Sequence, residues 1–192
     1  GAAVASIESA LGPTDVAVAN AGIGVQNAST RLNLERVKET MRTNFDGVLH
    51  LADIVLPAMI ARRSGQLAAV SSLAGWRGIP ANGPYCASKA AVSTLLEAWR
   101  IELAPYGVAV TTIHPGFVKT PMTAGDRNPM PFLLEVDDAA RRMADGLLAR
   151  KRRVDFPFQL ASIVGFGRGL PDWLYDRVMT RFAFVPKPKP RE

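Results

Sequence analysis

The stretch LAAVSS at residues 67–72 decides the fold class. Its apolar residues run in succession, without the alternation of a strand that has one face in water, which is typical of a strand covered on both faces. Two further runs, VAVA at 16–19 and VAVTTI at 108–113, have the same character. Because long helical patterns separate the three runs, the sequence predicts βαβ units and a doubly wound, Rossmann-like α/β fold with a parallel sheet.

The remaining elements follow from apolar periodicity and from Gly and Pro breakers. We expect one domain over residues 1–185, then a disordered, basic and Pro-rich tail at 186–192. The first long helix is expected to bend near Asn44. The expected elements are helices at 1–12, 33–62, 84–104, 136–150, 158–166 and 171–184, a short strand at 154–156 and a loop at 119–131.

Composition limits the class of protein. The chain has 192 residues, of which 48% are hydrophobic, enough for one domain with a sizeable core. Apolar stretches are broken before about 18 residues, so no membrane-spanning helix is expected. The single Cys86 and two histidines argue against a disulfide and a metal site. We expect a cytoplasmic protein, since the first residues carry no secretory pattern.

The net charge of +6 is concentrated late in the chain. Arg150-Lys151-Arg152-Arg153 forms one basic run, and KPKPRE closes the sequence. No nucleic-acid-binding motif accompanies these charges, so we expect no nucleic-acid partner. Cations favour helix C-termini, and the first run is therefore read as a solvated helix end.

Polar residues follow the strands at the edge where parallel sheets bind ligands. Tyr85 and Lys89 begin the helix after the second strand, and their i, i+4 spacing puts them on one helix face. We expect all these groups to converge on one edge of the sheet. The residues that follow the strands are Asn20, Ser71, Ser72, Pro115 and Gly116.

A tyrosine beside a lysine suits acid–base chemistry. A free phenol has a pKa of about 10 and is a poor acid or base at neutral pH. A nearby ammonium favours the phenolate and should lower the pKa of Tyr85 toward working pH. A serine hydroxyl could then hold a substrate oxygen against the phenol. Ser71 competes with Ser72 for this role, and the spacing of 13 residues to Tyr85 favours Ser72.

Five motifs occur in one order along the chain. They are Asn20-Ala21-Gly22, Arg42-Thr43-Asn44-Phe45, Ser71-Ser72-Leu73-Ala74-Gly75, Tyr85-Cys86-Ala87-Ser88-Lys89 and His114-Pro115-Gly116-Phe117-Val118-Lys119-Thr120. In their order and spacing they resemble the short-chain dehydrogenase/reductase family of nicotinamide-dependent oxidoreductases. The resemblance covers roughly residues 6 to 150.

The resemblance implies a catalytic tetrad. Tyr85 would exchange a proton with the carbonyl or alcohol oxygen, and Ser72 would orient that oxygen. Lys89 would lower the pKa of Tyr85 and bind the nicotinamide ribose, and Asn44 would hold a water that links Lys89 to solvent. The implied cofactor, NAD or NADP, would be bound by Asn20, Ala21, Gly22, Tyr85, Lys89, Pro115, Gly116, Val118 and Thr120, with no metal.

The family's opening strand and its TGxxxGxG turn do not occur in these 192 residues. In the family the Asn-Ala-Gly motif lies well inside the chain, whereas here it lies at residues 20–22. We therefore expect about 60 to 70 residues of the usual fold to be missing. Gly165-Phe166-Gly167-Arg168-Gly169 does not fit GxGxxG, and it reads instead as a helix end with a glycine stop.

Several residues shape the expected substrate site. Trp76, Arg77 and Ile79 fall between Ser72 and Tyr85, where a substrate wall would sit. An apolar loop suggests an apolar small-molecule substrate; it carries Met122, Met130, Phe132 and Leu133. Cys86 and His114 are read as structural.

Two surfaces suggest partners. The aromatic and basic C-terminal segment is expected to dock on the domain or a second subunit rather than on a membrane surface. The resemblance implies a homo-oligomer built through helices 45–62 and 86–104.

The sequence therefore favours an oxidoreductase that transfers a hydride between a nicotinamide cofactor and a carbonyl/alcohol pair. The alternative is a non-catalytic fragment or binding module that keeps the fold and has lost cofactor binding.

Overall fold

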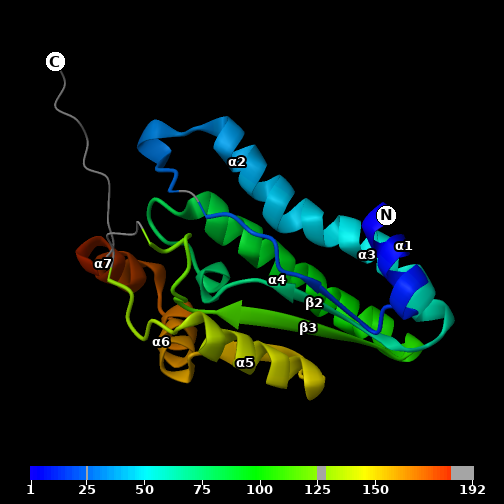
Figure 1. Ribbon diagram of the computed structural model, residues 1–192. Helices are drawn as coiled ribbons and strands as arrows, with labels where there is room; N and C mark the ends of the chain where they lie inside the picture. The colour runs from blue at the N-terminus through cyan, green and yellow to red at the C-terminus, as the bar shows by residue number, and fades with distance from the viewer. Residues whose placement is uncertain (25, 125–128, 183–192) are drawn as a thin grey trace.

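The computed structural model describes residues 1–24, 26–124 and 129–182. The tail predicted at 186–192 and part of the loop predicted at 119–131 lie outside the described residues. Within them the predicted alternation of strands and helices is confirmed (Figure 1).

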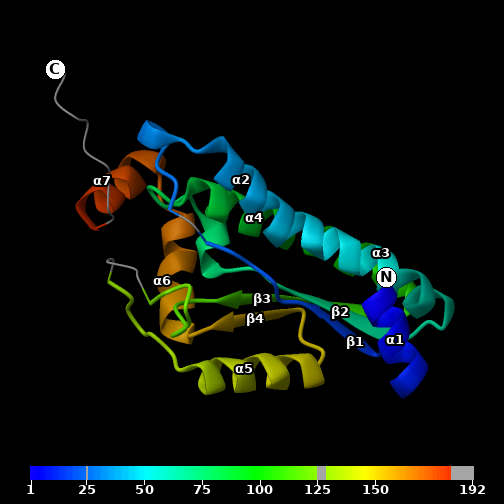
Figure 2. The same cartoon turned by 45° about the horizontal axis from the view of Figure 1, so that its top comes forward.

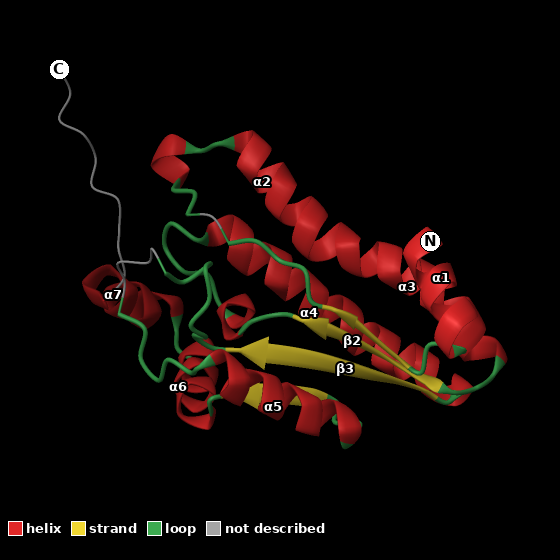
Figure 3. Cartoon of the chain, in the orientation of Figure 1, coloured by secondary structure: helices red, strands yellow, loops and turns green. Residues whose placement is uncertain are grey.

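Four parallel strands form the sheet, in the order β1-β2-β3-β4. Figure 3 draws the strands in yellow and the helices in red. They are β1 (Val16–Ala19), β2 (Gly65–Val70), β3 (Val108–Pro115) and β4 (Arg153–Phe156). Sequence reasoning ended the third strand at 113, before the His-Pro-Gly breaker. The strand continues because β4 provides a pairing partner for His114 and Pro115.

Helices cover both faces of the sheet, as predicted (Figure 2). One face packs against α3 (Gly47–Ala61) and α4 (Gly83–Leu103), and the other packs against α5 (Val136–Leu148). The residues of β2 divide between the two faces: Leu67 and Ala69 join the first core cluster, while Ala68 joins the second. This explains the continuous apolar run at 67–70, since every side chain has a helix-covered face to pack on.

The last crossover has the opposite hand from the two before it. The strands advance in one direction across the sheet, yet α3 and α4 lie on one face and α5 lies on the other. Right-handed connections are the strong default in parallel sheets. The change of face falls in the long connection between β3 and α5, of which residues 116–124 and 129–135 are described.

The helical stretch expected at 33–62 is divided in three. α2 (Leu34–Met41) leads into a π-helical turn, Arg42–Asp46, and then into α3. The turn falls on Asn44, where a bend was predicted. Such turns are rare and occur often at functional sites.

By length and composition alone, Leu34–Ala61 would also suffice to cross a membrane, although no spanning helix was predicted. Four of its side chains belong to the sheet-covering core: Val48, Ala52, Val55 and Met59. We therefore read this stretch as a core helix of the α/β fold.

The other described elements are short or lie at the ends of the chain. The helix predicted at 1–12 is confirmed as α1 (Ala2–Leu11). The remaining elements are the 3₁₀ turns η1 (Ser29–Arg31), η3 (Leu73–Trp76) and η4 (Ala104–Tyr106) and the helices α6 (Phe158–Arg168) and α7 (Asp172–Phe182). The predicted helix end with a glycine stop is confirmed at Gly169, which follows the last residue of α6. Gly165 and Gly167 lie inside the helix, which runs two residues further than predicted.

Candidate active site

The expected site residues gather at the carboxyl edge of the sheet. Asn20 follows β1, Ser72 follows β2, and Pro115 ends β3. Tyr85 and Lys89 lie in the first two turns of α4, which begins at the same edge. Pro84 stands in the first turn of α4, where the missing N–H has no helical partner to lose.

Asn44 connects the loop after β1 to α4. It is 1% exposed, and its Oδ1 accepts from the backbone N–H of Ile23 at 2.8 Å. Its Nδ2 donates to the Ile23 carbonyl at 3.0 Å and to Ser88 Oγ at 2.9 Å. The π turn is what aims this amide at Ile23. This interaction was not predicted, because no sequence signal connects position 23 with position 44. The water that Asn44 was expected to hold between Lys89 and solvent stays a prediction.

Lys89 is a buried cation with unused hydrogen-bonding capacity. It is 3% exposed, and Nζ donates to the Val70 carbonyl at 2.8 Å. Among the described residues no other acceptor hydrogen-bonds Nζ, which carries three protons. Burial lowers the pKa of Lys89 to about 8, because desolvation disfavours the charged form.

The environment of Tyr85 differs from the one expected. Burial raises the pKa of Tyr85, and this outweighs a hydrogen bond with Ser72 that acts to lower it. Lys89 was expected to lower the pKa. Its Nζ lies 5.8 Å from the centre of the Tyr85 ring and is directed to a backbone carbonyl, and its own charge is disfavoured by burial. Tyr85 is therefore held in its protonated form.

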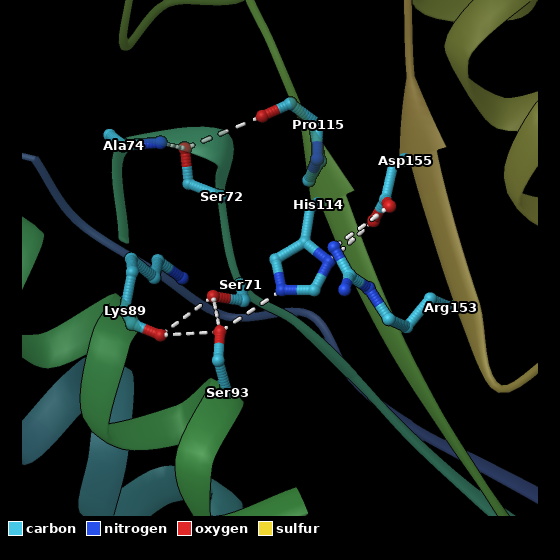
Figure 4. A network of polar contacts seen from close by, with 9 residues as sticks. All are labelled: Ser71, Ser72, Ala74, Lys89, Ser93, His114, Pro115, Arg153 and Asp155. Atoms are coloured by element: carbon cyan, nitrogen blue, oxygen red, sulfur yellow. Dashed lines mark hydrogen bonds and ion pairs between the residues drawn. The ribbon is translucent and has the colours of Figure 1, made fainter. Parts of the chain in front are cut away.

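The two serines after β2 have different surroundings (Figure 4). Ser72 Oγ accepts from the Ala74 N–H at 3.1 Å and reaches the Pro115 carbonyl at 3.4 Å, so it bridges η3 and the end of β3. Ser71 Oγ instead donates to the Lys89 carbonyl at 2.7 Å. Ser71 thus faces the side of α4, whereas Ser72 lies near enough to Tyr85 to act on the pKa of its phenol.

A polar network extends from Ser71 across the sheet (Figure 4). Ser71 and Ser93 contact each other at 2.8 Å, and Ser93 Oγ lies 3.0 Å from Nε2 of His114. The Nδ1 of this buried histidine lies 2.7 Å from Asp155 on β4. The network joins α4, β3 and β4 behind the site, which agrees with a structural reading of His114. The contact of Ser93 with Ser71 and His114 was not predicted from the sequence.

Asp155 ends the network at the protein surface, where Arg153 lies 3.0 Å from its second carboxylate oxygen. Burial alone would raise the pKa of Asp155, but the hydrogen bond and charge of His114, together with Arg153, lower it. Trp76 covers this end, with its ring 5.5 Å from that of His114 and 5.0 Å from the Arg153 guanidinium.

The residues expected along the cofactor lie in two loops at this edge. Asn20 and Ala21 are exposed and Gly22 is partly exposed in the loop after β1. Pro115 is partly exposed at the end of β3, and so are Gly116, Val118 and Thr120 in the connection that follows it. The Val118 side chain packs against the second core cluster, on the face of the sheet that α5 covers. The N–H of the neighbouring Lys119 donates to the Leu134 carbonyl. The described residues include no cluster of three metal-ligating side chains.

The space around Lys89 fits a hydroxylated ligand. A Cβ on Gly22 would lie 3.2 Å from Lys89 Nζ and 3.4 Å from Asn44 Oδ1, so glycine keeps the loop close to both polar groups. The unused protons of the buried ammonium face a loop that carries no side chain at this point. A nicotinamide ribose has the hydroxyls that such a site requires, and the residues present therefore fit NAD or NADP.

Gly75 allows η3 to lie directly on α4. A Cβ at this position would lie 2.8 Å from the Lys89 carbonyl carbon and 2.9 Å from the Ala90 nitrogen, and backbone atoms cannot swing aside. Gly75→Ala should therefore cost about 1–3 kcal/mol of unfolding free energy and lower turnover, because Ser72 shifts with η3. Urea unfolding and steady-state kinetics measure the two effects.

Gly78→Ala is the matched control, since a Cβ there would meet nothing within 4 Å. Equal stability and turnover in the two variants would show that the contact between η3 and α4 does not matter.

Apolar side chains adjoin Tyr85. A Cβ on Gly24 would lie 3.3 Å from Met122 Sδ and 3.5 Å from the Tyr85 ring, so this glycine sits between the loop after β3 and the phenol. Met122, Phe132 and Leu133 are all exposed. Of these three side chains, Met122 is the one that the structure places near the candidate acid.

Comparison with known proteins also indicates an oxidoreductase family. A family model described as short chain dehydrogenase matches residues 1–130. An uncharacterized oxidoreductase from Myxococcus xanthus (strain DK1622) is 42% identical over 178 residues, 93% of this chain and 70% of that protein. A 3-ketodihydrosphingosine reductase from Bacteroides thetaiotaomicron is 40% identical over 121 residues, 63% of this chain and 45% of that protein.

Among solved structures, a short chain dehydrogenase from Burkholderia cenocepacia J2315 in complex with NADP matches with a TM-score of 0.78. The match covers 92% of this chain and 73% of that chain, at 23% identity, and it supports the fold.

The chain belongs to the short-chain dehydrogenase/reductase family, as its motifs predicted. Family members are oxidoreductases that use NAD or NADP, so the expected cofactor class is confirmed at the level of the family. The chain spans 70% of the Myxococcus relative but less than half of the Bacteroides one.

Proposed function

We propose that this protein transfers a hydride between NAD or NADP and a carbonyl/alcohol pair, with Tyr85 as the acid/base. The observation that carries the proposal is the buried Lys89 ammonium. It lies at the same edge of the sheet as Tyr85, Asn44 and Gly22, which has no side chain. A buried cation with unused donors is costly unless a ligand occupies them.

Each residue then has a defined task. Ser72 is held by Ala74 and Pro115, which fixes its hydroxyl where it can bind a substrate oxygen beside the phenol. Tyr85, protonated because of its raised pKa, donates its proton to that oxygen as charge develops. A bound reduced nicotinamide supplies the hydride. Lys89 offers its unused N–H donors to the hydroxyls of the nicotinamide ribose, and Asn44 fixes the loop at Ile23 and Gly22 against α4.

We propose that reduction of an apolar carbonyl compound is the favoured direction. A protonated phenol is the form that gives a proton to a carbonyl oxygen, and Met122 offers an apolar side chain close to it. The name of the Bacteroides relative, a reductase of a keto compound, supports the same direction.

The test is oxidation of NADPH and of NADH in the presence of straight-chain methyl ketones of increasing length. We expect KM to fall as the chain lengthens, because each buried CH₂ contributes about 0.8 kcal/mol. Absence of ketone-dependent oxidation with both cofactors would overturn the proposal.

The alternative remains a binding module without catalysis. It rests on the lack of a TGxxxGxG turn in these 192 residues. Fluorescence titration with NADPH and NADH separates the two hypotheses, since a module that has lost cofactor binding gives no saturable signal with either.

A homo-oligomer is proposed through α3 and α4. A groove of about 590 Å³ runs along the outer side of these helices, and Leu49, Leu56, Ile60 and Trp99 contribute its apolar lining. A second copy of the chain would cover these side chains, and light scattering of the purified protein measures the assembly. The expected cytoplasmic location stays a prediction.

A further inference from the structure

Arg77 makes an unusual number of contacts for a residue in a surface segment. It follows η3, between Ser72 and Tyr85, and only 18% of its side chain is exposed. Its Nη1 lies within hydrogen-bond distance of three carbonyl oxygens at the end of α6: Gly167 at 2.9 Å, Arg168 at 3.3 Å and Leu170 at 2.7 Å. The sequence placed Arg77 in a substrate wall, but its side chain points to the C-terminal helices instead.

The same guanidinium reaches the start of α7. Its Nη2 donates to Asp172 Oδ1 at 2.7 Å, and its central carbon lies 4.0 Å from the centre of the Tyr175 ring. Tyr175 returns the contact, because its hydroxyl donates to the Gly78 carbonyl at 2.6 Å. Arg77 and Gly78 on one side and Asp172 and Tyr175 on the other thus form a closed set of polar contacts.

This arrangement satisfies the chemistry of the C-terminal end of α6. The last carbonyls of a helix have no helical partner, and a cation there also complements the helix dipole. The guanidinium carries five N–H donors in a rigid planar fork, so its two terminal nitrogens can bind acceptors on different elements, whereas an ammonium has three donors on one nitrogen. Arg77 therefore caps α6 and anchors α7 with one side chain.

α7 depends on these contacts. Over the described part of α7 no residue is classed as buried, and within the described chain no other hydrogen bond or ion pair joins α7 to the domain. α6, in contrast, packs on the site itself. A Cβ on Gly116 would lie 2.6 Å from Leu160, and one on Gly165 would lie 3.5 Å from the Trp76 ring.

We propose that Arg77 is a positioning residue that holds α6 and α7 against the segment between Ser72 and Tyr85, so that these helices form a wall of the substrate site. The substrate role rests on the proposed function. Ser72 and Tyr85 have their own supports, in the Ala74 N–H, the Pro115 carbonyl and the α4 backbone. Loss of Arg77 should therefore loosen the wall and spare the reacting groups.

The first readout is amide hydrogen exchange, which does not depend on activity. In Arg77→Ala we expect exchange across 172–182 to accelerate about 10-fold or more, since a charge-assisted hydrogen bond is lost. Arg77→Lys keeps the charge but cannot bridge α6 and α7, so it should also accelerate exchange there. Tyr175→Phe, which loses one hydrogen bond and keeps the ring contact, should have a smaller effect.

The second readout is the division between KM and kcat with a long-chain methyl ketone. We expect Arg77→Ala to raise KM several-fold with kcat nearly unchanged and with unchanged NADPH affinity, as for lost uniform binding. Arg177→Ala is the matched control, because it removes the same charge from an exposed position on α7.

Several results would overturn the inference. Unchanged exchange across 172–182 in Arg77→Ala would show that Arg77 does not hold α7. A fall in kcat with unchanged KM would show that Arg77 supports the reacting groups rather than the wall. If wild-type protein reduces no ketone, the proposed function fails and takes the substrate role with it, while the exchange data still decide whether Arg77 anchors α7.

Discussion

Replacing Tyr85 by Phe is expected to lower ketone-dependent turnover by about 10²- to 10⁴-fold, the range for loss of a general acid. The variant keeps the ring that packs beside Gly24 and Lys89 and loses only the hydroxyl. The fold and the cofactor affinity should therefore be nearly unchanged. Steady-state oxidation of NADPH measures turnover, and fluorescence titration measures cofactor binding in the same preparation.

Tyr106→Phe is the control for this experiment. Tyr106 lies in η4, next to the start of β3 and at the opposite edge of the sheet, and it is 45% exposed. It should behave as wild type. Turnover close to wild type in Tyr85→Phe would show that the phenol takes no part in the reaction, whatever the family resemblance implies.

The fold could be predicted because its signals are local. The runs at 16–19 and 67–70 are apolar at successive positions, which by itself predicts strands with helices on both faces. Pro84 marks the start of α4. The end of β3 could not be predicted in the same way. His114 and Pro115 resemble a breaker in sequence, and only pairing with Asp155 and Phe156, about 40 residues later, keeps them in the strand.

The site was predicted as a set of residues, but not in its connections. Spacing indicated that Ser72, Tyr85 and Lys89 share an edge. Spacing does not show that Asn44 binds the Ile23 backbone, or that Arg77 turns away from the substrate toward α6. These contacts join positions 21 and 90 residues apart, and nothing in the local sequence specifies them.

The balance between charge and burial also lay beyond the sequence. A tyrosine one turn from a lysine suggested an ammonium that lowers the pKa of the phenol. The fold buries Lys89 and partly buries Tyr85, and desolvation raises the pKa of Tyr85 and lowers that of Lys89. Desolvation disfavours whichever form is charged, so burying the pair weakens the effect that their spacing predicts.

The buried ammonium leads to the second large effect, which is seen in Lys89→Met. Methionine fills similar space without a charge, and turnover should fall about 10²- to 10³-fold, as for loss of one electrostatic donor in an active site. Lys89 should also make the unfolding free energy of the wild-type protein rise at high pH. The pKa of Lys89 is about 8 in the folded protein against an ordinary value of 10.5, so between these pH values the unfolded chain binds more protons.

Wild-type unfolding free energy therefore gains a contribution from Lys89 that grows as pH rises from about 8 to 10.5, up to about 3 kcal/mol. Lys89→Met should lack it. Burial raises the pKa of Cys86 and of Tyr85, and these groups act in the opposite sense. Only the difference between the two urea-unfolding series isolates Lys89. Lys38→Met, at an exposed position on α2, should parallel wild type. If Lys89→Met also runs parallel to wild type, Lys89 is not a desolvated cation, and the main support for a ligand-binding ammonium is lost.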